Sequence, residues 1–362
     1  MKLLSFVFFV KVIVVLVGAL VLGFGGLLAF LSVTEYRPGT VERADAEGAG
    51  TRVPVVGVPM TVVSWNIGYG SLDAGMDFFM DGGKATRPPT DANVKENMRG
   101  VRDFIGRTDA DIVLLQEVDI HSYRSYYMDQ AAFLAETWDG ATAFAPNFRT
   151  AFVPIPLPHP LGRVDSGLFT LSAFAARESL RVSLPSPFKW PVRLANLKRC
   201  ILVERLPVAD SDKELILVNL HLEAYSSAEG RDAQMRVLLD FLKAEYAKGN
   251  YCIAGGDFNQ NFPRVDENMF RLKDVRHFTP GVLSQDTLPE GWRFAADTEV
   301  PSSRLLNEPY SGDWETTQLY AIDGFALSPN VEVLSVQTAN HEFRYSDHNP
   351  VVLKAVLKAE FP

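Results

Sequence analysis

The stretch E-L-I-L-V-N-L-H-L, Glu214 to Leu222, shows in one segment the pattern on which the fold of this chain depends. Its run of Leu, Ile and Val predicts a β-strand. The run reaches His221, so a side chain that titrates near neutral pH lies at the end of an apolar strand. The same combination of apolar run and polar end recurs along the chain.

Further apolar runs predict a set of short strands, interspersed with helical patterns over 92–107, 129–138 and 227–248. In the last of these, Met235, Leu238 and Leu242 recur at helical spacing. Strands mixed with long helices at irregular intervals predict a layered α/β domain. The predicted strands are 61–65, 111–115, 167–172, 200–206, 214–222, 251–254, 321–328 and 350–357.

Polar residues stand at the ends of these strands, and strand ends of a rigid sheet converge on one rim. Each residue alone has an ordinary explanation, such as a turn, an exposed acid or a hydrogen-bonded core histidine. A buried carboxylate such as Asp323 needs a partner, which makes the ordinary explanation weakest there. The recurrence at six strand ends favours a shared site. Its members are Asn66, Glu117, His221, Asp257 with Asn259, Asp323, and Asp347 with His348.

The residue types in this set indicate a particular chemistry. Carboxylate and amide oxygens without cysteine favour Mg²⁺ or Mn²⁺ over zinc. Two histidines with carboxylate partners suit acid–base catalysis or charge stabilisation. A hard cation beside such residues suits the attack of water on a phosphate ester.

Composition limits the alternatives only partly. The chain has 362 residues, is 47% hydrophobic and carries a formal charge of −9, so it can form a large core. An acidic chain is a poor general binder of nucleic acid, although a bound metal ion makes an acidic site attractive to phosphate. Cys200 and Cys252 lie in apolar runs and are expected to be buried thiols rather than a disulfide framework.

The N-terminal part predicts a membrane anchor. The uncharged run from Val12 to Val33 is long enough, as a helix, to cross ~30 Å of hydrocarbon. It is longer than the apolar core of a signal peptide, so we expect residues 1–33 to be an uncleaved single-pass anchor. Lys2 and Lys11 precede the span, which slightly favours an inside N-terminus and an extracytoplasmic main domain.

Residues 34–58 mix Gly, Ala, Pro and charges without periodicity, which predicts a flexible linker before a domain over 59–362. Within that domain, the proline-rich stretch P-I-P-L-P-H-P-L-G, residues 154–162, predicts a stiff exposed loop.

Taken in chain order, the strand-end motifs resemble those of the endonuclease/exonuclease/phosphatase superfamily, the DNase I-like metal-dependent phosphoesterases. The resemblance extends over nearly the whole predicted domain. The matching segments are V-V-S-W-N-I-G (62–68), D-I-V-L-L-Q-E-V (111–118), S-G-L-F-T-L-S (166–172), L-V-N-L-H-L-E-A (217–224), A-G-G-D-F-N (254–259), A-I-D-G-F-A-L-S (321–328) and Y-S-D-H-N-P-V (345–351).

The resemblance implies a four-layer α/β/β/α sandwich and a role for each strand-end residue. Glu117 would be the main Mg²⁺ ligand, with Asn66 and Asp347 near the metal. Asp257 and Asn259 would orient or activate water and hold the phosphate, and His221 would stabilise the pentavalent phosphorus. His348, oriented by Asp323, would act as base or phosphate stabiliser. The general base is assigned to the His348–Asp323 pair, with Asp257 as the rival.

The substrate stays open between two phosphodiester classes. His221-Leu222-Glu223-Ala224 is similar to a turn of neutral-sphingomyelinase-like enzymes, which together with the anchor favours a phospholipid or sphingolipid headgroup. The segment 186–199, in which Phe188 and Trp190 alternate with basic residues, is consistent with a lipid headgroup interface. DNA or RNA is the alternative substrate, and a non-catalytic binding domain on the same fold is a third hypothesis. The sequence leaves the oligomeric state unknown.

Overall fold

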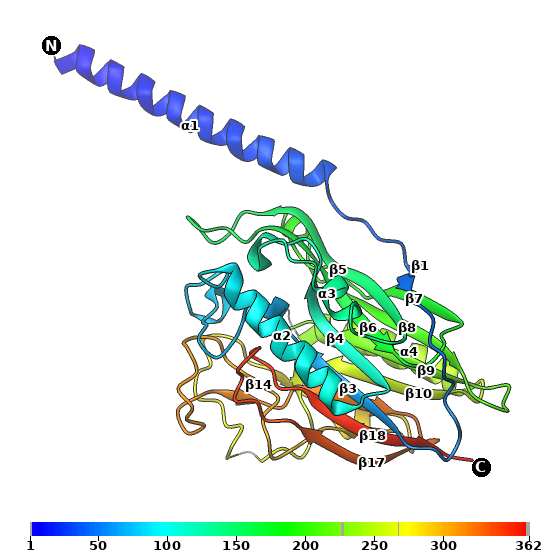
Figure 1. The fold of residues 1–362 in the computed structure, drawn as a ribbon. Coiled ribbons are helices and arrows are strands. Elements are labelled where there is room, and N and C mark those ends of the chain that lie inside the picture. The colour runs from blue at the N-terminus through cyan, green and yellow to red at the C-terminus, as the bar shows by residue number, and fades with distance from the viewer. Residues whose placement is uncertain (1, 226–227, 267, 360–362) are drawn as a thin grey trace.

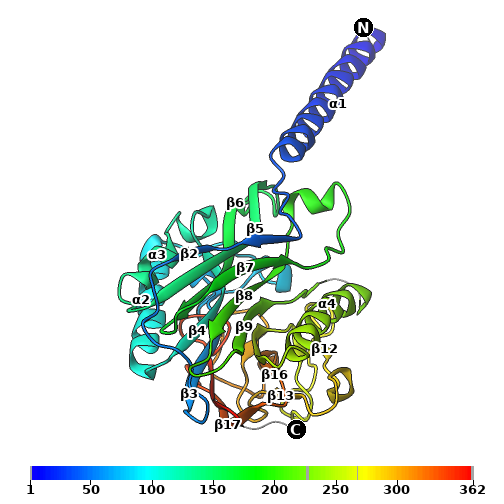
Figure 2. The same ribbon diagram turned by 90° about the vertical axis from the view of Figure 1, so that its right-hand side faces the viewer.

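The computed structural model describes residues 2–225, 228–266 and 268–359. Two seven-stranded β-sheets pack face to face, and helices cover their outer faces (Figures 1 and 2). The predicted α/β/β/α sandwich is therefore confirmed.

The first sheet has the strand order β17-β18-β3-β4-β6-β5-β2. Its neighbours β3 and β4 run parallel, and the other neighbours run antiparallel. Its strands are β2 (Asp45–Glu47), β3 (Met60–Asn66), β4 (Ile112–Asp119), β5 (Ala141–Val153), β6 (Gly162–Ser172), β17 (Val331–Thr338) and β18 (Val351–Leu357).

The second sheet has the order β1-β7-β8-β9-β10-β16-β13, again with one parallel pair, β9 and β10, among antiparallel neighbours. Its strands are β1 (Val41–Arg43), β7 (Glu178–Ser183), β8 (Cys200–Pro207), β9 (Glu214–His221), β10 (Tyr251–Asp257), β13 (Arg293–Ala295) and β16 (Asp323–Leu327). Two small ribbons pair β11 (Gln260–Asn261) with β12 (Gly281–Val282) and β14 (Ser303–Arg304) with β15 (Leu319–Tyr320).

Alternate residues of the central strands pack into different layers. In β4, Ile112 and Leu114 belong to the core between the sheets, whereas Val113 and Leu115 pack against the outer helices. Both faces of these strands are thus buried, which explains their continuous apolar runs. The outer helices are α2 (Asp91–Thr108) and α3 (Gln130–Ala135) on the first sheet and α4 (Ala228–Tyr246) on the second. Short 3₁₀ segments are η1 (Gly68–Gly70), η2 (Phe79–Asp81), η3 (Tyr123–Ser125), η4 (Val192–Ala195) and η5 (Gln285–Thr287).

Each predicted strand overlaps an observed one, and the predicted helices correspond to α2, α3 and α4. The prediction missed three long strands, β5, β7 and β17. Position 227 of the last predicted helix lies outside the described residues, as do Met1 of the predicted anchor and positions 360–362 of the predicted domain.

The N-terminal helix α1 (Lys2–Val33) extends away from the sandwich (Figure 2). Its part from Phe6 to Val33 is long and apolar enough to cross a membrane. The segment 34–58, predicted to be a flexible linker, contains the edge strands β1 and β2. They pair with β7 in one sheet and β5 in the other.

A buried amide pair joins the two sheets. In β9, Asn219 accepts a hydrogen bond from Gln116 of β4 (2.8 Å) and donates to the carbonyls of Leu115 and Phe169 (3.1 Å each). The β4–β6 ladder has a bulge between Leu115 and Val118. The Asn219 side chain therefore hydrogen-bonds to backbone carbonyls of β4 and β6 beside the bulge.

We expect Asn219→Ala to lower the free energy of unfolding by about 2–4 kcal/mol, because it leaves buried hydrogen-bonding groups of the first sheet without their partner. Urea denaturation of the full chain in detergent measures this. The matched variant Asn340→Ala changes an exposed asparagine and should stay within ~0.5 kcal/mol of the wild type. Equal changes in the free energy of unfolding for the two variants would contradict a stabilising role of the Asn219 hydrogen bonds.

Candidate active site

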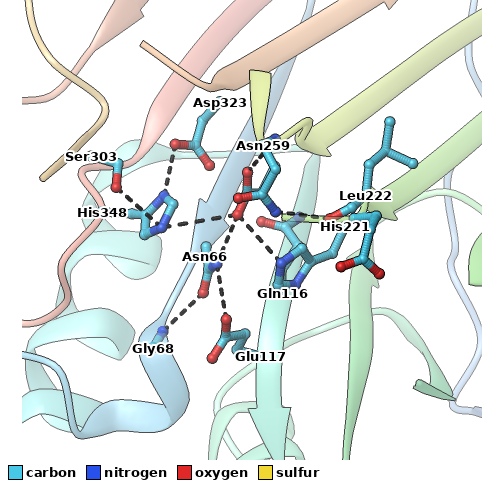
Figure 3. Close-up of polar contacts among 12 residues, drawn as sticks. Asn66, Gly68, Gln116, Glu117, His221, Leu222, Asn259, Ser303, Asp323 and His348 are labelled. Atoms are coloured by element: carbon cyan, nitrogen blue, oxygen red, sulfur yellow. Dashed lines mark hydrogen bonds and ion pairs between the residues drawn. The ribbon is translucent and has the colours of Figure 1, made fainter. Parts of the chain in front are cut away.

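The ends of five strands and the residues just before β18 meet at one edge of the sandwich (Figure 3). In the second sheet, Asp257 pairs in register with His221 on one side and with Asp323 on the other, so three polar residues lie on adjacent strands. The first sheet contributes Asn66 and Glu117, and His348 precedes β18. The structure therefore brings together the residues that the sequence placed at strand ends.

Gly256, directly before Asp257, allows β10 to lie close to β9. Gly256 has φ +151°, and a Cβ there would lie 1.9 Å from the carbonyl oxygen of Leu220 on β9. No larger residue fits between the two strands without moving them.

His348 and Asp323 form a buried pair. The Nδ1 of His348 lies 2.8 Å from Oδ2 of Asp323, and the same carboxylate oxygen accepts a hydrogen bond from the hydroxyl of Ser302 (2.7 Å). Burial lowers the pKa of His348, but Asp323 and Asp347 outweigh it and raise that pKa to about 10. His348 is therefore a cation at neutral pH. Its Nε2 lies 3.3 Å from the hydroxyl of Ser303.

Asp257 lies between the two histidines. Its Oδ2 is 3.5 Å from Nε2 of His221, 3.9 Å from Nε2 of His348 and 3.1 Å from Nδ2 of Asn66. Burial, and then the nearby charge of Asp323, raise the pKa of Asp257 to about 7. A carboxylate with that pKa can exchange a proton near neutral pH.

His221 differs from His348 in charge. Burial, and then the positive charges of Arg199 and His348, lower the pKa of His221 well below its usual value, so its ring is neutral. Among the described residues, its Nδ1 has no hydrogen-bond partner. The two histidines therefore offer Asp257 one neutral and one cationic neighbour.

Two asparagines hold Asp257. The backbone N–H of Asn259 donates to Oδ1 of Asp257 (2.8 Å), and its side-chain nitrogen donates to the carbonyl of Leu222 (2.8 Å). Asn66 donates through Nδ2 to Asp257 and, at 3.4 Å, to Glu117, while its oxygen accepts from the N–H of Gly68. In this structure the nitrogen of Asn66 faces the carboxylates, and a metal contact through its oxygen would require the amide to turn.

Glu117 sits in the β4 bulge with a left-handed backbone, φ +55°. This conformation is uncommon for a residue with a side chain and often marks functional sites. The bulge interrupts the alternation of β4, so Gln116 reaches Asn219 between the sheets while Glu117 lines the cavity beside His221 and Asp257.

The donor set fits a hard divalent cation. Asp347 is 8% exposed, and burial, with a contribution from Glu117, raises its pKa to about 6 although His348 opposes the rise. Gly68 leaves space beside it, because a Cβ there would lie 2.8 Å from Oδ1 of Asp347. The carboxylates of Glu117 and Asp347, with space beside them, suit Mg²⁺, because this ion keeps several waters and binds through one or two carboxylates. Asp257, Asp323 and His348 also have possible ligand atoms within 4.8 Å of one another. In that group, however, Asp323 and His348 are already hydrogen-bonded to each other.

A cavity of about 250 Å³ opens from these residues, and much of its wall is apolar. Its lining includes Tyr69, Leu72, Phe78, Phe148, Phe188 and Leu306.

Sequence reasoning missed Ser302 and Ser303, which bond Asp323 and His348. They lie in P-S-S-R, a stretch without strand or motif pattern, and Ser303 forms an isolated bridge with His348. Arg304, in the same stretch, donates to the carbonyls of Asp73 and Met76 and so holds a loop.

Residues 63–348 match the Endonuclease/Exonuclease/phosphatase family, and the chain belongs to that family. Its members are phosphoesterases and nucleases, and most depend on divalent metals. The resemblance drawn from the motifs is thereby confirmed. No curated protein matches the chain.

Three solved structures illustrate the shared fold. An endonuclease/exonuclease/phosphatase from Beutenbergia cavernae has TM-score 0.56 and 17% identity, covering 83% of this chain and 72% of that one. A family protein from Bacteroides thetaiotaomicron has TM-score 0.53 and 16% identity, covering 84% and 97%. D. rerio TDP2 humanized by 14 mutations has TM-score 0.50 and 16% identity, covering 82% and 98%.

We expect Glu117→Gln to weaken Mn²⁺ binding by at least about tenfold, because it removes a charged ligand. Titration calorimetry of the full chain in detergent measures the affinity. Glu332→Gln, on the exposed face of β17, is the control and should bind Mn²⁺ as the wild type does. Unchanged affinity in Glu117→Gln would exclude Glu117 as a ligand.

The raised pKa of His348 also predicts how stability depends on pH in EDTA. A histidine whose pKa rises from 6.5 to about 10 on folding stabilises the fold fully below pH 6.5 and loses this contribution as pH rises towards 10. The unfolding free energy of the wild type should therefore fall relative to that of Asp323→Asn between about pH 7 and pH 10. Parallel profiles for the two proteins would contradict the ion pair.

Proposed function

We propose that this chain is a membrane-anchored phosphodiesterase that uses Mg²⁺ or Mn²⁺ to cleave a phospholipid or sphingolipid headgroup. The observation that carries the proposal is the buried cluster of His221, Asp257, Asp323 and His348 beside Glu117, at one end of a cavity with an apolar wall. The cluster supplies the chemistry, and the apolar wall suits a substrate with hydrocarbon parts.

Asp257 is the general base in this proposal. Its Oδ2 is close to both histidines, and its pKa of about 7 suits removal of a proton from water. His348, paired with Asp323, is already protonated, so it donates a hydrogen bond or a proton to the phosphate through Nε2. The general base in this proposal is therefore Asp257, the alternative named from the sequence, and not the His348–Asp323 pair.

Neutral His221 and the side chain of Asn259 border the same cavity and would hold the phosphate oxygens. Glu117 and Asp347, with Asn66 beside them, would hold the cation, which when bound neutralises charge that develops on the phosphate.

The anchor in this proposal is α1. The most apolar 18-residue window of the part from Phe6 to Val33 has mean hydropathy 2.8, and none of it is buried in the domain. A helix of this kind finds its apolar surroundings in a bilayer. Lys2, Lys11 and the N-terminal amine precede the span, and Arg37 and Arg43 follow it, a slight bias that supports a catalytic domain on the extracytoplasmic side.

The full chain, reconstituted with lipid, should hydrolyse sphingomyelin or phosphatidylinositol with Mg²⁺ or Mn²⁺ and lose the activity in EDTA. Asp257→Asn should lower kcat by about 10³-fold, because it removes the base while keeping the shape of the side chain. Glu332→Gln serves as the control with wild-type activity.

The same panel contains single- and double-stranded DNA. Cleavage of DNA without cleavage of either lipid would replace the lipid proposal by the nuclease alternative. Full activity of Asp257→Asn would refute the assigned base, and Mn²⁺ binding without hydrolysis of any substrate would favour a non-catalytic domain.

A further inference from the structure

Two loops form the outer rim of the active-site cavity. Ile155 from the first loop (154–161) and Phe188 and Leu197 from the second (186–198) line the cavity. The second loop contacts β5, the strand that leads into the first loop, because Lys198 donates to the carbonyl of Asn147 (2.7 Å) and Thr150 donates to that of Leu194 (3.4 Å).

The tips of these loops expose large apolar side chains to solvent. Leu157 is 83% exposed, Val192 58%, and Ile155 and Trp190 55% each. We call these four residues the apolar rim. Several exposed apolar side chains on adjoining loops mark an interaction surface, whereas single ones are ordinary.

The end of α1 docks on the same rim. Trp190 donates through Nε1 to the hydroxyl of Ser32 (3.3 Å), one residue before α1 ends. Glu35, whose side chain is 3% exposed, forms ion pairs with Arg193 (3.2 Å) and Lys198 (3.1 Å). In both ribbon views α1 leaves the domain at this end (Figures 1 and 2).

We propose that the apolar rim inserts into the bilayer that α1 spans, so that the active-site cavity opens onto the lipid surface. The proposal rests on the anchored phosphodiesterase inferred above. A hydrogen bond from Trp190 to the end of α1 places the rim where the helix leaves the hydrocarbon, the level at which tryptophan is enriched. Exposed Lys189 lies on the same loop, suitably placed for lipid phosphates.

A bilayer is the occupant that this geometry favours over a peptide or a second copy of the chain. The helix that would cross the membrane ends on the rim itself, so a bilayer around α1 meets these side chains without any further partner. Leu157 and Val192 are exposed and do not belong to the cavity lining. Their exposure therefore serves the outer surface rather than the chemistry.

Fluorescent labelling tests the insertion without needing activity. Leu157→Cys and Val282→Cys are labelled with an environment-sensitive fluorophore in the full chain, in nanodiscs of phosphatidylcholine and phosphatidylglycerol. Val282 is 72% exposed, on β12, away from α1 (Figure 2). The native Cys200 and Cys252 are buried, so labelling is specific.

Spin-labelled lipid should quench the label at position 157 at least about twofold more than the label at position 282. Equal quenching would overturn the proposal. Shielding of the label at position 157 that increases with protein concentration in detergent would also overturn the proposal, because a second copy of the chain would then be the occupant.

An activity measurement separates this proposal from the proposed function. Leu157→Glu should lower hydrolysis of vesicles containing sphingomyelin and phosphatidylinositol by about tenfold, because it places a charge in the bilayer. Hydrolysis of soluble bis(4-nitrophenyl) phosphate should be unchanged, and Val282→Glu should change neither. Unchanged vesicle hydrolysis by Leu157→Glu would overturn the proposal that the apolar rim inserts into the bilayer. A wild type that hydrolyses neither substrate refutes the proposed function, while quenching still decides the insertion.

Discussion

The contact between Asn219 and the bulge in β4 sets the relation between the two sheets. It fixes which residues of β4 and β9 face one another across the core between the sheets. Glu117, in the bulge, lines the cavity, and the pairing of β9 with β10 places His221 beside Asp257. One buried amide thus supports both the packing of the core and the geometry of the site, because the bulge that presents Glu117 is stabilised from the opposite sheet.

The site concentrates more negative charge than its neighbours balance. Asp257, Asp323 and Asp347 are each less than 10% exposed, and the pKa values of Asp257 and Asp347 are raised. Protonated His348 offsets part of this charge. A divalent cation would offset more, so cation binding and the stability of the folded state are linked. The sandwich holds like charges together at a cost in free energy that a bound cation would reduce.

The sequence was sufficient for the sandwich and for the identity of the clustered residues, because strands buried on both faces read as unbroken apolar runs and their polar ends stand out. It was insufficient for β5, which contains Pro146 and Arg149, and for β17, an edge strand with exposed polar positions. Ser302 and the strained backbone of Glu117 escaped it as well. Their roles come from contacts between segments far apart in the chain, and no local pattern encodes such contacts. The raised pKa of His348 likewise depends on Asp323 and Asp257, which lie on two separate strands, as well as on its neighbour Asp347.

The pairing of β18 with β3 joins segments from opposite ends of the domain, with Val351 opposite Ser64. Asp347 and His348 come into place only with this pairing, since they directly precede β18. During translation, β3 leaves the ribosome long before β18 does, and contacts of such long sequence separation form late. Until this pairing forms, the cluster therefore lacks Asp347 and His348. The site is therefore incomplete until β18 has left the ribosome and paired with β3.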